Sequence, residues 1–493
     1  MIRTSCASVL ALSLALSGLS ALAQEEETPR VPQNAAAGPR PTATPTPSAM
    51  SSRRDESRHD LAQRAGFQAL HICTGLFTSG MSEELVFDTL SRELPTDDPS
   101  LTIDREAKTV AVSYLDDMPP RLAVWRENMG CTQLPIAATE ETAENLIAWP
   151  ESLERPDYDD MDWPMGDQNA TAPPPEGTKA DLDAVLDDAF KDQDGTFKGD
   201  TWGIAIIKDG KIIAERYDPE YDMHVSARTN SMCKSLSATV VGVGVQKGLV
   251  DINEPAPLKA WQTPGDPRGK ITIANMLNMA SGLWTSGSGN PQGDLYGSGA
   301  PASEVSVLNM IDAEPGSRFV YAGSDTIMSV MAVREAFDND EKWVSFPHEE
   351  LMWKLGMTRT VMETDWKNDF LGSGQCWSTV RDFGRFGLLY LNGGEWNGEQ
   401  LIPEDWPEYV STYAPAQPRS AAVGGAGYGA QFWLYDERQG MSSPGYSAAG
   451  AFGQYAMIVP DENLVVVRRG LDVGDGFSIA EFTAAVMEAL ETE

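Results

Sequence analysis

The order of strand and helix patterns in about the last three fifths of the chain limits the fold most strongly. Two strand-like runs, 202–207 and 211–217, flank the turn signal Lys208-Asp209-Gly210 and predict a hairpin. Three more strand patterns come late in the chain, at 428–435, 454–459 and 463–468. Helical patterns fill the interval between the early and the late strands. We therefore predict an α+β fold, in which helices flank one antiparallel sheet and form an inserted helical subdomain.

Helical periodicity marks three segments of this interval, at 231–247, 271–279 and 379–391. The first segment stops at Gly248, a typical residue after a helix end. Residues 285–303 are rich in Gly and Ser and lack periodicity. We predict a long loop there, with a lid over a functional site as the less favoured alternative.

The first 23 residues have the pattern of an export signal. Arg3 gives a positive start, 9–22 is an apolar run, and Ala21-Leu22-Ala23 fits the small-x-small cleavage rule. We predict a signal peptide at 1–23 and a periplasmic or secreted protein. An uncleaved anchor is less favoured, because the apolar run is short for a bilayer span. No later stretch is long and apolar enough to span, so we expect no stable membrane insertion after signal removal.

Three further regions follow the signal. Residues 24–59 are rich in Pro, Ala, Thr and Ser, which predicts a disordered linker. Residues 60–150 combine a helical pattern with strand patterns at 101–114 and 122–125, so we predict a small α+β region. It carries no recognisable chemistry. Residues 151–493 form the predicted main domain, which contains the sheet.

The charge balance excludes one class of partner. The chain has 37 basic and 73 acidic residues, a net charge of −36. Phosphate backbones need a basic face, so we predict no nucleic-acid partner, and anionic lipid surfaces are disfavoured too. Solubility is the simplest interpretation of this acidity.

The five cysteines give two expectations. Cys6 leaves with the signal peptide. Cys73 and Cys131 lie in one segment of a chain that we predict to be exported, and we leave open whether they form a disulfide. Cys233 and Cys376 are predicted to be small, buried apolar residues. No Cys/His cluster has metal-ligand spacing, so we predict no metal site.

Ser231-Met232-Cys233-Lys234 is the most reactive pattern in the chain. At i and i+3, the hydroxyl and the amine share one helix face, and the helix start favours developing negative charge. For Lys234 to accept a proton near neutral pH, its pKa must fall by roughly three units, about 4 kcal/mol, which only burial can supply. We predict that Ser231 is a nucleophile and Lys234 its base.

A Ser-His-Asp triad is the competing arrangement. The chain has only four histidines: His59, His71, His224 and His348. None lies in a G-x-S-x-G context, and His224, seven residues before Ser231, is the least remote. Lysine is therefore the better candidate base.

Five stretches, in order, resemble the serine β-lactamase and penicillin-binding-protein-like superfamily, especially its class C-like esterase and 6-aminohexanoate-dimer hydrolase branch. They are RTNSMCKS at 228–235, KITIANMLNMASGLW at 270–284, PGSRFVYAGS at 315–324, GQCWSTVRDFGRFGLLYLNGGEWNGEQLIPEDW at 374–406 and SAAGAFGQYAMIVPDENLVVVRRG at 447–470. The resemblance covers about 195–493 and implies that 151–493 is a β-lactamase-like serine hydrolase domain. The fold it implies agrees with the sheet-and-helix pattern above.

The resemblance assigns further roles, residue by residue. Tyr321 matches the tyrosine that passes a proton to the leaving group, although an aromatic core residue is the alternative. The third motif aligns with Ala448-Ala449-Gly450, so the N–H groups of Ala451 and Ser231 would form an oxyanion hole. Gly323, Ala449 and Gly450 would contact substrate. No metal or organic cofactor is implied.

Two departures from the family pattern bear on substrate. Gly323 replaces an asparagine, and Ala448 and Ala449 replace a cation or hydroxyl that holds a carboxylate, unless a residue such as Arg381 reaches in. We therefore predict hydrolysis of small esters or amides through an acyl-enzyme on Ser231. One alternative is a β-lactamase or D-Ala-D-Ala carboxypeptidase. The other alternative is a catalytically silent module that binds peptidoglycan or a partner protein. The sequence does not specify the acyl group or the oligomeric state.

Overall fold

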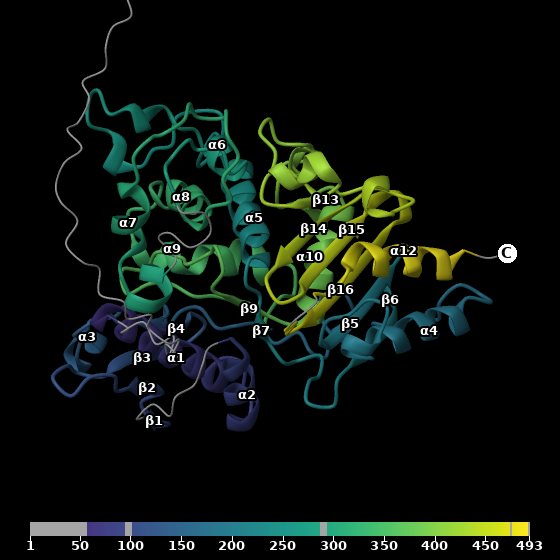
Figure 1. The fold of residues 1–493 in the computed structure, drawn as a ribbon, viewed down its shortest axis with the longest axis horizontal. Coiled ribbons are helices and arrows are strands. Elements are labelled where there is room, and N and C mark those ends of the chain that lie inside the picture. Colours follow the sequence, from purple (N-terminus) through teal and green to yellow (C-terminus); the bar gives the residue numbers. More distant parts are fainter. Residues whose placement is uncertain (1–56, 94–100, 286–292, 474–475, 492–493) are drawn as a thin grey trace, which may run out of the picture. The chain divides into compact units, whose positions relative to one another are not determined.

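A seven-stranded sheet organises the main domain in the computed structural model, which describes residues 57–93, 101–285, 293–473 and 476–491 (Figure 1). Its strands lie in the order β12 (Gly427–Tyr428), β13 (Trp433–Tyr435), β14 (Gly445–Gly450), β15 (Gln454–Val459), β16 (Leu464–Gly470), β5 (Thr201–Lys208) and β6 (Lys211–Tyr217). Every neighbouring pair is antiparallel. The predicted hairpin and the late strands therefore share one sheet, and the predicted α+β fold is confirmed.

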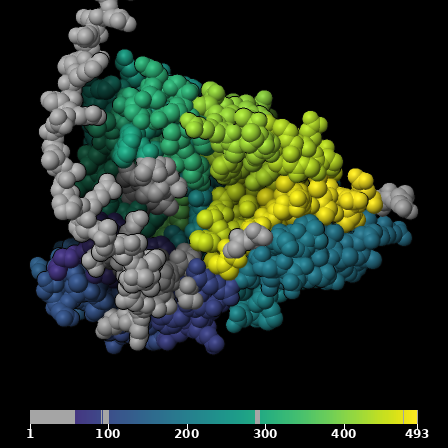
Figure 2. Space-filling model, in the orientation of Figure 1, coloured from purple at the N-terminus to yellow at the C-terminus, as the bar shows by residue number. Residues whose placement is uncertain are grey.

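Helices cover both faces of this sheet. Successive residues of a strand point to opposite sides, so β5 presents apolar side chains to the helices on each face. On β5, Ile204 and Ile206 pack with α4 (Lys179–Ala189) and α12 (Ile479–Leu490). Ala205 and Ile207 pack into the larger core, which includes residues of α5 (Met232–Gln246) and α10 (Val380–Leu391). In Figure 2 the yellow C-terminal residues lie against the blue residues of α4 and the β5–β6 hairpin, as the pairing of β16 with β5 requires.

The inserted helical part lies between β6 and the late strands in the sequence. Its main helices are α6 (Ile273–Leu277), α7 (Ala302–Val305), α8 (Gly323–Arg334), α9 (Asp340–Pro347) and α11 (Trp406–Ser411). Helix α5 packs against both α8 and β14, so it connects the helical part to the sheet. A second sheet has three short strands, in the order β7 (Ala227–Arg228), β9 (Cys376–Ser378) and β8 (Val361–Met362). Of these, β7 lies just before α5 in the chain.

The N-terminal region, which we define as the described residues of 57–150, has its own sheet and helices. Helix α1 (Arg58–Phe77) packs on the strands β2 (Thr109–Val112), β3 (Arg121–Arg126) and β4 (Gly130–Gln133). The other elements are β1 (Leu101–Asp104), which pairs with β2, and the helices α2 (Glu83–Glu93) and α3 (Glu140–Glu144). A Cys73–Cys131 disulfide joins α1 to β4, which settles the question left open above.

Two strand predictions need correction. The pattern at 101–114 was expected to be one strand, but it forms β1 and β2, with Lys108 in the left-handed region at φ 50°. The pattern at 428–435 likewise divides into β12 and β13, with Gln431 at φ 68°. In both cases a non-glycine residue adopts positive φ between the two strands, which the residue type itself does not signal.

The loop prediction at 285–303 is wrong in part. Residues 286–292 lie outside the described residues, but Asp294–Ser298 form a helical turn, η5, and α7 follows. The Gly- and Ser-rich composition of this segment hides the turn, since contacts with α1 and β4 hold it. The predicted signal peptide, and the predicted linker up to residue 56, also lie outside the described residues. Within the described part of the chain, no helix is long and apolar enough to cross a membrane.

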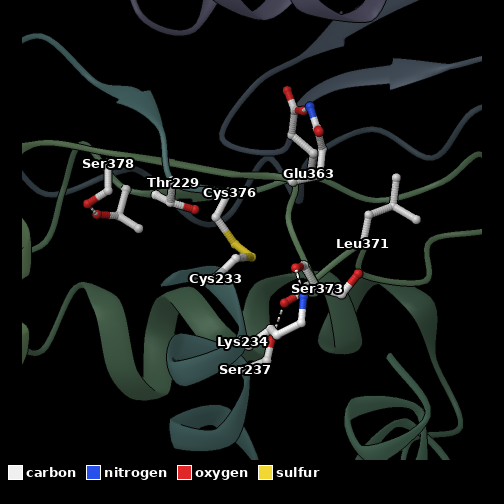
Figure 3. The surroundings of a disulfide bond; sticks show 12 residues. Thr229, Cys233, Lys234, Ser237, Glu363, Leu371, Ser373, Cys376 and Ser378 are labelled. Carbon is white, nitrogen blue, oxygen red and sulfur yellow. Dashed lines mark hydrogen bonds between the residues drawn. A yellow bond between two sulfur atoms is a disulfide. The ribbon is translucent and has the colours of Figure 1, made fainter. Parts of the chain in front are cut away.

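The prediction for Cys233 and Cys376 is also wrong in part. Both side chains are fully buried, as expected, but they form a disulfide (Figure 3). Strand β7 pairs with β9 and leads directly into α5, so Cys376 is brought beside the first turn of that helix. The two Cα atoms are 5.5 Å apart, within the range that a disulfide spans.

Candidate active site

Ser231 lies at the start of α5, where the chain leaves β7. The preceding Asn230 has φ 48°, a left-handed conformation that asparagine tolerates, and its side-chain amide donates to Ala451 O at 3.1 Å. The Ser231 hydroxyl makes no capping hydrogen bond to α5, so it remains available to other groups. The local backbone therefore presents this hydroxyl at the positive end of a 15-residue helix.

Lys234, one turn along α5, lies beside that hydroxyl. Its Nζ atom is 3.3 Å from Ser231 Oγ and also donates to the carbonyl of Ser373. Only 1% of the residue is exposed, and burial lowers its pKa to about 7. The drop that the sequence argument required is thus supplied by desolvation, and a neutral amine is available near neutral pH.

Tyr321 completes this cluster. Its hydroxyl interacts with the side chain of Ser231, which opposes the rise of the tyrosine pKa, and its ring centroid lies 5.1 Å from Lys234 Nζ. Burial raises the tyrosine pKa to about 12, so the phenol stays protonated at neutral pH. The ring also packs at right angles to Tyr428 with centroids 6.0 Å apart. The structure brings the three predicted residues together, and Tyr321 has aromatic packing as well as a polar partner.

Gly450 ends β14 directly against the start of α5. A Cβ atom at this position would lie 2.3 Å from Thr229 O and 3.0 Å from Ser231 N, so only glycine permits the approach. The next residue, Ala451, is the one whose carbonyl Asn230 holds. The predicted third motif is therefore adjacent in space to the Ser231 backbone.

A pocket of about 390 Å³ opens over these residues. Its lining residues carry no charged group and include four aromatic rings: Ser231, Tyr321, Trp433, Tyr435, Ala449, Gly450, Ala451 and Tyr455. Trp433 and Tyr435 lie on one face of β13, because they are two positions apart. The pocket thus offers a hydroxyl, backbone groups and aromatic surface.

Gly323, one predicted substrate position, and Ala448 of the third motif do not line this pocket. Ala448 is fully buried in the hydrophobic core, so no side chain at this position would face the pocket. Gly323 is the buried first residue of α8 and is not among the lining residues. Only Ala449 and Gly450 of the predicted substrate-contacting set line the pocket.

His224, the alternative base, and Arg381, the alternative partner for a substrate carboxylate, do not line this pocket and have other partners. His224 Nε2 lies 3.1 Å from Asp167 Oδ2, and His224 lines a separate pocket of about 440 Å³ that does not include Ser231. Arg381 pairs with Glu215 at 2.7 Å and with Asp167 at 3.2 Å, so its charge is already neutralised. None of the four histidines lines the Ser231 pocket. Arg381 therefore does not supply the missing carboxylate partner.

Sequence reasoning missed several residues of this site. Trp433, Tyr435 and Tyr455 could have been found as aromatic residues on predicted strands near the third motif. Ser373 gave no usable signal, because it contributes a backbone carbonyl that any residue possesses. Tyr296, which contacts Ser373, lay in the segment predicted to be a loop.

This fold and site are those of a serine hydrolase. The sequence matches the Beta-lactamase family over residues 186–468, more than half of the chain, and the protein belongs to that family. One similar protein is named a 6-aminohexanoate-dimer hydrolase and one structural neighbour a carboxylesterase, and the protein is a hydrolase of this family.

Single proteins similar to this chain share only a small part of its sequence. The 6-aminohexanoate-dimer hydrolase of Paenarthrobacter ureafaciens is 21% identical over 282 residues, which are 53% of this chain and 70% of that protein. The crystal structure of a family VIII carboxylesterase superposes with a TM-score of 0.51 at 14% identity, covering 66% of this chain and 98% of the other. A structure from Bacteroides dorei DSM 17855, provisionally named a beta-lactamase, superposes with a TM-score of 0.51 at 20% identity. The match covers 63% of this chain and 98% of the other. At these identities the structural likeness shows the fold.

Proposed function

We propose that the protein hydrolyses small carboxylic esters or amides through an acyl-enzyme on Ser231. One observation carries this proposal: a buried lysine with a pKa of about 7 lies 3.3 Å from a serine hydroxyl that lines an open pocket. A buried amine costs stability, and its placement beside a nucleophile is typical of a functional base.

The proposed reaction begins with proton transfer from Ser231 Oγ to neutral Lys234. The Nζ–Oγ separation is slightly longer than a transferring hydrogen bond, as is common in free enzymes. Oγ attacks the substrate carbonyl carbon, and the N–H groups of Ser231 and Ala451 stabilise the oxyanion. Tyr321 passes the proton to the leaving oxygen or nitrogen, and the acyl-enzyme remains. Water then attacks the carbonyl carbon of the acyl-enzyme, and its proton passes through the same groups to Ser231 Oγ. The bond between Oγ and the acyl carbon breaks, which releases the acid.

The pocket walls favour uncharged substrates. None of its lining residues carries a charge to hold a β-lactam or D-Ala carboxylate, and such a hydrogen bond is worth about 1.5–3 kcal/mol. The names of the two similar hydrolases, a 6-aminohexanoate-dimer hydrolase and a carboxylesterase, support linear amides or esters as substrates. A silent binding module is less favoured, because Ser231, Lys234 and Tyr321 are all present and in contact.

We also propose that the protein is exported, to the periplasm or beyond, after cleavage of 1–23. Two disulfides, Cys73–Cys131 and Cys233–Cys376, support this, since structural disulfides persist in oxidising compartments. Mass spectrometry of the protein recovered from cell fractions would test it. A cytosolic protein that still begins at Met1 would contradict the proposal.

The decisive assay is a comparison of kcat/KM on one preparation. Short-chain p-nitrophenyl esters and linear amides should be cleaved much faster than nitrocefin or penicillin, with Ser231→Ala as the blank. Should nitrocefin be faster by tenfold or more, the β-lactamase alternative replaces this proposal. Substantial ester hydrolysis by Ser231→Ala would remove Ser231 as the nucleophile.

A further inference from the structure

The carbonyl of Ser373 is the second hydrogen-bonding partner of the Lys234 amine. A neutral amine has one lone pair, and donation of a hydrogen to Ser373 O fixes the direction in which that lone pair points. Ser373 belongs to the stretch 371–376, which ends at the Cys233–Cys376 disulfide (Figure 3). The position of this stretch therefore decides how the lysine faces Ser231.

Tyr296 also supports this stretch. Its hydroxyl lies 2.5 Å from Ser373 Oγ and 3.3 Å from Leu371 O. The ring is buried, and Tyr296 is part of the helical turn η5. Displacement of η5 would thus move the support of the Ser373 carbonyl.

The N-terminal region holds η5 in place. The buried guanidinium of Arg121 donates to Gly297 O and Ser298 O of η5, both at 3.0 Å. The same group donates to Ala62 O and Leu134 O, both at 2.8 Å, so it joins α1, the end of β4 and η5. Burial lowers the arginine pKa to about 10, so the group stays charged at neutral pH.

Two neighbouring contacts strengthen this junction. Gln133 Nε2 on β4 donates to Gly297 O at 2.9 Å. Helix α1 approaches η5 so closely that a Cβ atom on Gly66 would lie 2.1 Å from Gly297 O. The approach therefore depends on a glycine in α1.

A second connection runs through Glu363. Its carboxylate accepts from Thr74 Oγ1 at 2.5 Å and from Cys131 N at 2.7 Å, both in the N-terminal region. It also accepts from Gln375 Nε2 at 2.7 Å, and Gln375 belongs to the stretch 371–376. Two separate sets of polar contacts thus link the N-terminal region to the residues around Ser373.

We infer that the N-terminal region is a positioning element for the catalytic lysine: through Arg121, η5 and Tyr296 it fixes the Ser373 carbonyl that orients Lys234. This inference rests on the proposed function. It gives residues 57–150 a role in the reaction, although no residue of that region lines the Ser231 pocket.

Two conservative variants test the connection. Tyr296→Phe removes the hydroxyl that supports Ser373, and Gln133→Leu removes one bond to η5. Tyr390→Phe is the matched control, since its buried hydroxyl bonds Thr239 Oγ1 at 2.7 Å in the core, away from the pocket. The readouts are kcat, KM, thermal stability and the pH dependence of Ser231 labelling by a fluorophosphonate probe.

A looser support should admit water to Lys234 and raise its pKa toward the ordinary value. The ring of Tyr321 faces the amine, and Tyr296 contacts Ser373, the amine's other partner. Both tyrosines have a pKa of about 12, so neither titrates in the measured range. Glu363 does titrate in this range, with a pKa of about 7. A Glu363→Gln variant therefore measures how much Glu363 contributes to the rise of Ser231 labelling with pH, which we call the labelling limb. The limb should survive in this variant, because Lys234 carries it.

The expected result is a three- to tenfold lower kcat in Tyr296→Phe and Gln133→Leu, the worth of one hydrogen bond. KM should change less than twofold, and the labelling limb should move to higher pH. Tyr390→Phe should lose stability without moving the limb. If the labelling limb does not move in either variant, or if both variants change only as Tyr390→Phe does, the positioning role of the N-terminal region is wrong, while the proposed function still stands. Wild-type protein that is neither labelled at Ser231 nor hydrolytic would overturn the proposed function as well.

Discussion

Gly450 lies so close to Ser231 that a Cβ atom on Gly450 would stand 3.0 Å from the Ser231 backbone nitrogen. The same atom would be 2.3 Å from the carbonyl of Thr229, a backbone contact that cannot yield by side-chain rotation. The end of β14 and the start of α5 are therefore one packed unit. If the N–H groups of Ser231 and Ala451 form the oxyanion hole, its width is set by this contact.

Gly450→Ala should consequently impair catalysis more than folding. The added methyl must push β14 away from α5, and loss of one oxyanion donor typically lowers kcat by about 10²–10³. Hydrolysis kinetics and thermal unfolding of the purified variant would measure both effects. Gly476→Ala is a suitable control, because its Cβ atom would meet nothing closer than 3.9 Å. Near-wild-type kcat in Gly450→Ala would contradict this assignment of the oxyanion hole.

The activity should rise with pH along a limb near pH 7. Only neutral Lys234 can accept the serine proton, and burial lowers its pKa to about 7. Activity is therefore lost as pH falls through that value, although the measured limb belongs to the coupled lysine, serine and tyrosine. Lys234→Arg should be nearly inactive at every pH tested, since guanidinium does not deprotonate in this range. A variant with arginine that retains near-wild-type kcat/KM would assign the proton to another group.

The same lysine should cost stability, with a defined dependence on pH. Its folded pKa of about 7 is below the ordinary 10.5, so the unfolded chain binds the proton more tightly. The cost is absent above the unfolded pKa, grows as pH falls toward 7 and is constant below that. Lys234→Met should thus stabilise the protein by up to about 5 kcal/mol at pH 6 and by little at pH 10. Urea unfolding at the two pH values measures this, and an equal gain at both would exclude the linkage.

Local patterns account for what the sequence predicted well. The β5–β6 hairpin and α5 follow from alternation, a turn signal and helical periodicity within a few residues. The approach of Lys234 to Ser231 follows from their i, i+3 spacing on one helix. Tyr321 is different, because it lies 90 positions away, and only the family resemblance indicated its role.

The remaining features depend on tertiary contacts that no local pattern reports. Cys376 meets Cys233 because β9 pairs with β7, a pairing of two- and three-residue strands without a sequence signature. The turn η5 forms in a Gly- and Ser-rich segment because Arg121 and Gln133 hold its carbonyls. Ala448 was counted as a missing carboxylate partner, whereas strand alternation turns it into the core.

The Cys233–Cys376 disulfide should contribute both stability and activity. It closes a loop of 143 residues, against 58 for Cys73–Cys131, and longer loops lose more unfolded-chain entropy. Replacing both cysteines of the longer loop by alanine should cost about 2–5 kcal/mol of unfolding free energy, roughly 1 kcal/mol more than the shorter pair. Because Cys233 lies between Ser231 and Lys234, the variant should also lower kcat at temperatures where it remains folded. Urea unfolding and ester hydrolysis of both double variants give the comparison. Unchanged kcat in the folded Cys233→Ala/Cys376→Ala protein would show that this bond stabilises the fold without aligning the catalytic turn.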